Sequence, residues 1–129
     1  MTVPDELRYT AEHEWVAING TVASVGITDY AQRALGDVVY VSIPAAGTAV
    51  TAGEPCGEVE STKSVSDIFA PVDGEVIEAN PEIEDDPGLV NSDPYGAGWL
   101  LRIKLAGDGP DPDSLLTADQ YAALVKEAE

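Results

Sequence analysis

The chain has 129 residues, with 24 Asp and Glu against 6 Lys and Arg, and a formal net charge of −18 at pH 7. Nucleic-acid affinity rests on many cationic contacts to phosphates, and anionic membrane surfaces repel acidic proteins, so this charge excludes nucleic acid and membranes as partners. One Cys and one His exclude an internal disulfide framework and a His/Cys zinc site, and we expect no bound metal. Hydrophobic residues make up 44% of the chain, which suits one core and a single domain over residues 1–129.

The N-terminal residues, MTVPD, look like neither a secretory signal nor a transit peptide. No apolar run approaches the roughly 18 to 20 residues that a membrane span needs. We therefore expect a cytoplasmic protein.

Alternation of apolar and polar residues predicts short strands through the middle of the chain. In chain order they occupy residues 14–18, 21–27, 37–43, two stretches between 56 and 70, 75–79 and 99–105. Residues typical of turns separate them, among them Asn19-Gly20, which suits a two-residue hairpin, and Pro71-Val72-Asp73-Gly74. The pattern predicts antiparallel sheets folded over a small core.

Two helices complete the predicted elements. A short one over 29–35 is capped by Thr28 and ended by Gly36. A second, after a break at 107–112, covers about 117–128 and begins with a capping box at Thr117. The acidic run at 81–88 lacks the spacing of a calcium loop, so we interpret it as solvated.

The alternation also assigns faces within two strands. One strand is expected to place Val39, Val41 and Ile43 on a single face. The other is expected to turn Trp99, Leu101, Ile103 and Leu105 inward and Leu100, Arg102 and Lys104 outward.

The segment 57–74, GEVESTKSVSDIFAPVDG, predicts an unusual hairpin. A tip at Thr62-Lys63 places three carboxylates on one face near the turn, those of Glu58, Glu60 and Asp67. Crowded like charges weaken a sheet, and Thr-Lys lacks the Asn, Asp or Gly that a tight turn prefers. Such breaks of local rules tend to fall at functional sites, although spacing alone favours a solvated surface lysine.

Several motifs together resemble a known family. Glu60-Ser61-Thr62-Lys63-Ser64, followed by Asp67 and by residues 71–76 (PVDGEV), is similar to the lipoyl-attachment motif. A longer series is similar, in order, to the H proteins of the glycine cleavage system: His13-Glu14-Trp15, Gly26-Ile27-Thr28-Asp29, Ala31-Gln32, Leu35-Gly36-Asp37, Pro87-Gly88-Leu89-Val90-Asn91, Pro94-Tyr95 and Gly98-Trp99. The similarity covers nearly the whole chain.

The resemblance implies a mainly β, flattened β-hybrid fold of the barrel-sandwich, lipoyl-like kind. Its central lipoyl-like part would span about 20–106, with (R)-lipoate covalently attached to Lys63 at the hairpin tip. The chain would then be a carrier and not an enzyme. A protein with a single cysteine needs a borrowed disulfide to accept electrons and a carbon fragment together.

The resemblance also implies the partners of this carrier. A decarboxylating glycine dehydrogenase with pyridoxal phosphate would load an aminomethyl group onto the lipoyl arm. An aminomethyltransferase would pass the carbon to tetrahydrofolate, and dihydrolipoamide dehydrogenase would reoxidise the arm. A lipoate-attaching enzyme would modify Lys63. Because a shuttle must dissociate from each partner, we expect a monomer with small, transient interfaces.

The resemblance further implies that the loaded arm folds into a cleft on the carrier. A cationic amine there calls for carboxylates, and Glu14 and Asp67 carry over for this role. Glu12 stands where the family often has Ser, so an additional carboxylate in the cleft is expected in place of a hydroxyl. Glu60 and Asp67 are also candidates for recognition by the lipoate-attaching enzyme.

Four alternatives remain open from the residues. A biotin carrier is disfavoured because Thr62 and Ser64, rather than methionines, flank Lys63. A lipoyl domain of a 2-oxo acid dehydrogenase would normally be tethered by Pro/Ala-rich linkers. An H-like protein that relays lipoyl groups to other apoproteins would need the same lysine, and an unmodified acidic scaffold would need only the charge.

Overall fold

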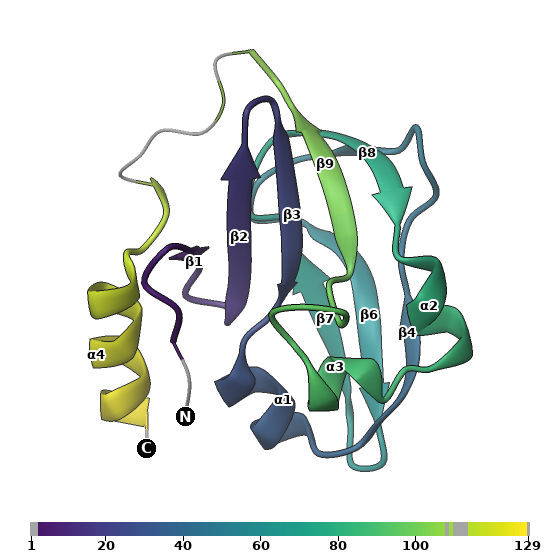
Figure 1. Ribbon diagram of the computed structural model, residues 1–129, viewed down its shortest axis with the longest axis vertical. Helices are drawn as coiled ribbons and strands as arrows, with labels where there is room; N and C mark the ends of the chain where they lie inside the picture. The colour runs from purple at the N-terminus through teal and green to yellow at the C-terminus, as the bar shows by residue number, and fades with distance from the viewer. Residues whose placement is uncertain (1–2, 108, 110–113, 129) are drawn as a thin grey trace.

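The computed structural model describes residues 3–107, 109 and 114–128 and is shown in Figure 1. Within these residues two antiparallel sheets form the body of the molecule, which confirms the predicted fold class. One sheet has six strands in the order β1-β2-β3-β9-β8-β5, and the other has three in the order β4-β6-β7. The strands are β1 (Arg8–Tyr9), β2 (Glu14–Asn19), β3 (Val22–Ile27), β4 (Val38–Ser42), β5 (Ala49–Val50), β6 (Pro55–Ser61), β7 (Val65–Phe69), β8 (Gly74–Ala79) and β9 (Leu101–Leu105).

Within the described residues, four helices lie around the sheets (Figure 1). They are α1 (Asp29–Leu35), α2 (Pro81–Asp85), α3 (Leu89–Ser92) and α4 (Ala118–Ala128). The bounds of α1 agree with the prediction: the Thr28 hydroxyl accepts a hydrogen bond from the Ala31 amide, and Gly36 ends the helix at φ +82°. The capping box of α4 also forms, because the Gln120 amide donates to the Thr117 hydroxyl and the Thr117 amide donates to the Gln120 side chain.

The core consists of two apolar clusters. The larger fills the space enclosed by the sheets with aliphatic residues such as Val25, Val59, Ile68 and Ile103, each at most 1% exposed. The smaller joins α4 to β1 and β2: Tyr121 stacks on Tyr9, and Trp15 belongs to the same cluster. Residues at both ends of the chain thereby share one apolar cluster.

The first hairpin forms one residue later than predicted. Asn19 pairs with Val22 as a strand residue, so the turn consists of Gly20 and Thr21 rather than Asn19-Gly20. Gly20 has φ +65°, a conformation that glycine adopts without steric cost.

Two face assignments were wrong. The register shifts in β4 between Val38 and Tyr40, so Val38 and Val41 are buried while Val39 is 48% exposed. Leu100 is fully buried, not outward, because β9 begins only at Leu101 and strand alternation does not reach it. Its amide donates to the Val25 carbonyl from the preceding loop.

The acidic run at 81–88 is also more ordered than predicted. Residues 81–85 form α2, whose first turn is capped by Asn80. Ile83 anchors this helix in the larger core cluster while Glu82 and Glu84 stay exposed. The predicted break at 107–112 lies mostly outside the described residues. Among those that are described, no helix is both long and apolar enough to span a membrane.

Candidate functional site

The β6–β7 hairpin has the register predicted from the sequence. Glu60 pairs with Val65 and Glu58 pairs with Asp67 across the two strands. Because directly paired residues project to the same side of a sheet, Glu58, Glu60 and Asp67 share one face. The predicted crowding of three exposed carboxylates beside the tip is therefore confirmed.

The tip is held by a serine hydroxyl instead of the usual turn residues. The buried Ser61 Oγ accepts hydrogen bonds from the amides of Lys63 and Ser64, both at 3.1 Å. The Ser61 amide closes the turn by donating to the Ser64 carbonyl at 2.8 Å. Serine can satisfy nearby amides in this way, which explains how a Thr-Lys turn is tolerated without Asn, Asp or Gly.

Lys63 projects from this turn beside the end of α1. A Cβ atom at Gly36 would lie 2.9 Å from Lys63 Cε, so the lysine stem packs closely over the glycine backbone. The Thr62 amide donates to the Asp37 carbonyl at 3.0 Å, which fixes the tip to the same segment. Asn91 braces that segment by donating to the Gly36 carbonyl and accepting from the Val38 amide. Lys63 itself is exposed to solvent.

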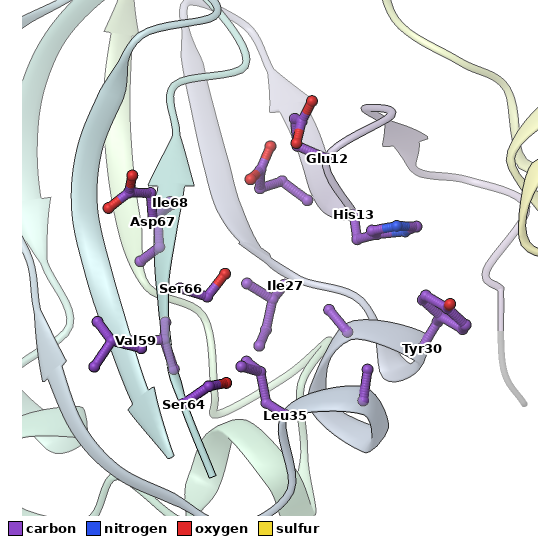
Figure 2. Close-up of a pocket in the computed structure, with 14 residues that line it drawn as sticks. Glu12, His13, Ile27, Tyr30, Leu35, Val59, Ser64, Ser66, Asp67 and Ile68 are labelled. Atoms are coloured by element: carbon purple, nitrogen blue, oxygen red, sulfur yellow. The ribbon is translucent and has the colours of Figure 1, made fainter. Parts of the chain in front are cut away.

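A cavity of about 310 Å³ lies next to the tip, between α1, β7 and the loop that precedes β2 (Figure 2). It is lined in part by Ser64, the residue after Lys63, and in part by Glu12, His13 and Glu14. Its remaining lining is mainly apolar and comes from Ile27, Tyr30, Ala31, Ala34, Leu35, Val59, Val65, Ser66, Asp67 and Ile68. The cavity thus joins the surroundings of Lys63 to a carboxylate-bearing wall through an apolar middle.

Glu14 is the buried carboxylate of this cavity, at 2% exposure. The Thr10 hydroxyl donates to Glu14 Oε1 at 2.7 Å, and the Phe69 amide donates to Oε2 at 3.2 Å. Burial raises the pKa of Glu14 from 4.5 to about 7, although both hydrogen bonds act in the opposite direction. A carboxyl with its pKa raised in this direction is partly protonated near neutral pH, and a nearby cation would favour its charged form.

The other predicted residues lie at different places around the site. Glu12 and Asp67 both line the cavity with Glu14, whereas Glu60 lies outside its lining. Asp67 is at the rim, because Ser66 and Asp67 project to opposite sides of β7 in Figure 2. The structure therefore brings Glu12, Glu14 and Asp67 to one cavity, with Glu14 as its buried member.

Sequence reasoning missed the residues that support these side chains. Thr10 organises the loop before Glu14, since its hydroxyl also accepts from the Glu12 and Glu14 amides at 3.2 Å. A threonine ahead of a turn is a known signal for such local bonding, so Thr10 was in principle detectable. Tyr121 also contacts His13, although the two residues are 108 positions apart in the sequence. No local sequence pattern predicts this contact.

A known protein family matches nearly the whole chain. The family model described as "Glycine cleavage H-protein" matches residues 7–128. The chain belongs to the glycine cleavage H-protein family. The function of this family is that of a lipoyl carrier in glycine cleavage, a component that is not itself catalytic.

Individual relatives agree over nearly the full length. The chain is 60% identical over 124 residues to the glycine cleavage system H protein of Beutenbergia cavernae, covering 96% of this chain and 97% of that one. It is also 60% identical over 131 residues to the H protein of Mycobacterium tuberculosis, covering 97% and 98%. The crystal structure of the H protein from Mycobacterium marinum superposes with a TM-score of 0.88 at 46% identity, covering 96% and 99%.

Proposed function

We propose that this chain carries (R)-lipoate as an amide on Lys63 and acts as one carrier domain of the glycine cleavage system. The observation that carries the proposal is the position of Lys63 on an ordered turn, exposed to solvent and one residue from the cavity lining. The amide would replace the lysine charge with a long flexible stem. Lipoate supplies a disulfide, and the chain's own Cys56 offers no substitute, because burial raises the pKa of that thiol to about 11.

The residues of the cavity fit a lipoyl arm that bears an amine. Its middle is lined by Ile27, Leu35 and Val59, which suit an apolar stem and ring. Its far wall holds Glu14, which would pair with a cationic amine and is already hydrogen-bonded on both oxygens. Glu12 and Asp67 add negative charge at the rim, so the loaded arm is held by its amine and sheltered by the apolar middle.

The proposed partners follow the family function. They are the decarboxylating glycine dehydrogenase, the aminomethyltransferase and dihydrolipoamide dehydrogenase, with a lipoate-attaching enzyme that recognises Glu60 and Asp67 beside the tip. All four would have to approach the same exposed lysine. We propose a monomer that meets them in turn in the cytoplasm.

The attachment site is tested by Lys63→Arg, because a guanidinium keeps the charge but cannot form the lipoyl amide. The variant should fold normally and lose carrier activity completely in an assay reconstituted with the three glycine-cleavage enzymes. Lys104→Arg and Lys126→Arg are matched controls at the other two lysines and should retain full activity. Residual turnover by Lys63→Arg would show that the arm is attached elsewhere.

A further inference from the structure

One hydroxyl group from the C-terminal helix joins two walls of the cavity. The Tyr121 hydroxyl lies 2.8 Å from His13 Nδ1, on the loop before β2, and 2.7 Å from Thr28 Oγ1, the cap of α1. His13 lines the cavity directly, and α1 supplies Tyr30, among other residues, to the neighbouring part of its lining (Figure 2). Tyr121 is fully buried in the smaller core cluster, so α4 holds this hydroxyl in a fixed place.

The hydrogen bonds of this group have a favoured direction. Thr28 Oγ1 already accepts from the Ala31 amide, so its own hydrogen is available for the Tyr121 oxygen. Tyr121 can then donate to His13 Nδ1, which leaves the ring neutral with its proton on Nε2. A charged His13 would donate from Nδ1 to the Tyr121 oxygen, which would reverse the direction of both hydrogen bonds. The hydroxyl hydrogen of the fully buried Thr28 would then need another acceptor. Burial lowers the pKa of His13 and so also favours the neutral ring, whereas the negative charge of Glu12 acts in the opposite direction.

His13 needs such support because its backbone is unusual. It has φ +69°, a left-handed conformation that a residue with a side chain rarely adopts and that surrounding contacts must maintain. Its carbonyl accepts from the Thr28 amide at 3.0 Å, and its ring packs on Tyr30 with centroids 4.7 Å apart. A neutral His13 ring leaves the adjacent Glu14 carboxylate free to pair with a bound cation. A charged ring would compete with that cation for Glu14.

We propose that Tyr121 is a positioning residue of the aminomethyl site, which acts through His13 to keep that wall of the cavity closed and uncharged. The inference rests on the proposed function, in that the cavity receives the aminated arm. It makes α4 part of the site, although none of the α4 side chains that the structure describes lines the cavity.

The test is Tyr121→Phe, which keeps the ring and removes the hydroxyl. Tyr9→Phe is the matched control: Tyr9 is equally buried and stacks on Tyr121 with centroids 4.7 Å apart, but its hydroxyl donates to the Pro4 carbonyl away from the cavity. Because the chain has one histidine, the ring nitrogens of His13 give a unique NMR signal in the protein without a tag. The unlipoylated Tyr121→Phe variant should show a changed tautomer signature and a higher His13 pKa, and Tyr9→Phe should show neither.

A second readout uses the lipoylated protein. Spontaneous loss of the carried aminomethyl group should be about fivefold faster in Tyr121→Phe, the effect expected of one lost hydrogen bond, and unchanged in Tyr9→Phe. Thr28→Ser, which keeps the hydroxyl, should preserve the normal His13 signature. An unchanged His13 signal in Tyr121→Phe, or equal changes in both Phe variants, would overturn the proposal. Failure of Lys63 to accept lipoate in the unsubstituted chain would instead overturn the proposed function, since the NMR readout does not depend on the arm.

Discussion

Glu14 is a carboxylic acid whose surroundings oppose its charge. At 2% exposure it has little water to solvate the ionised form, and the Thr10 hydroxyl and Phe69 amide compensate only in part. The folded-state pKa of about 7 lies above the ordinary value of 4.5. The folded chain therefore holds a proton on Glu14 between these two values, where the unfolded chain has released it.

This raised pKa predicts a pH-dependent stability at one residue. The contribution of Glu14 is fully present below pH 4.5 and is lost as the pH rises to about 7. Glu14→Gln removes the ionisation, so its free energy of unfolding relative to the unsubstituted chain should rise by on the order of 3 kcal/mol between pH 4.5 and pH 8. Urea unfolding across this range measures the difference.

The matched control for that prediction is Glu60→Gln, at an exposed carboxylate outside the cavity. It removes one negative charge from the same acidic protein. Its free energy of unfolding relative to the unsubstituted chain should change far less between pH 4.5 and pH 8. An equal pH dependence for Glu60→Gln and Glu14→Gln would show that total charge, and not burial of Glu14, is responsible.

Glu14 and Asp67, two of the three carboxylates that line the cavity, are expected to hold the aminated arm unequally. Glu14 is buried in the cavity, whereas Asp67 lies at the rim on the face that it shares with Glu58. A buried ion pair is screened less by water, so Glu14→Gln should speed spontaneous loss of the carried aminomethyl group more than Asp67→Asn does. The release of ammonia from lipoylated, loaded protein measures both, and the reverse order would assign the amine to the rim.

At the scale of elements, the β6–β7 hairpin depends on one hydroxyl. Ser61→Ala leaves the Lys63 and Ser64 amides without their acceptor, which should cost about 1 kcal/mol of stability and slow enzymatic lipoylation of Lys63. Ser66→Ala, an exposed position of the same hairpin, is the control and should change neither quantity. Chemical denaturation and the rate of lipoate incorporation test the two effects, and normal lipoylation of Ser61→Ala would show that the tip needs no fixed shape.

The elements that could be predicted from the sequence are those whose signals are local. The bounds of α1 follow from a capping threonine and a terminal glycine, and the register of the β6–β7 hairpin follows from alternation about a two-residue tip. The two-residue strands β1 and β5 are too short to show any period, and α2 and α3 span hardly more than a turn. The prediction of which β4 residues face the core was wrong because a bulge has no clear signature in a single sequence.

The residues of the candidate site likewise fall into those that sequence motifs predict and those that depend on tertiary packing. Lys63, Glu12, Glu14 and Asp67 came from motifs, because the family resemblance fixes them residue by residue. The contact of Tyr121 with His13 and Thr28 depends on how α4 packs against the sheet, which no local pattern encodes. The raised pKa of Glu14 likewise comes mainly from burial in the folded chain, and the nearby Thr10 and Glu12 only modify it.

For the whole molecule, the net charge of −18 is expected to govern encounters with the proposed partners. A strongly acidic carrier should dock against basic surfaces around the active sites of its partners. At 0.1 M ionic strength, salt largely screens such attraction beyond about 10 Å. The association rate with glycine dehydrogenase, followed by stopped flow, should therefore fall steeply as salt is raised, with a smaller change in dissociation. A rate that does not depend on salt would contradict electrostatic steering.

Lys63 is the proposed attachment point of the lipoyl arm, and the intact mass of the protein tests this attachment. The protein should be produced in cells able to lipoylate, with a known lipoyl domain as a parallel control, and then mapped by peptides across Lys63. We predict a mass increment of one lipoyl group, located on Lys63 and absent from Lys104 and Lys126. An unmodified chain beside a fully modified control would contradict lipoylation of Lys63 and favour an acidic scaffold that works without the cofactor.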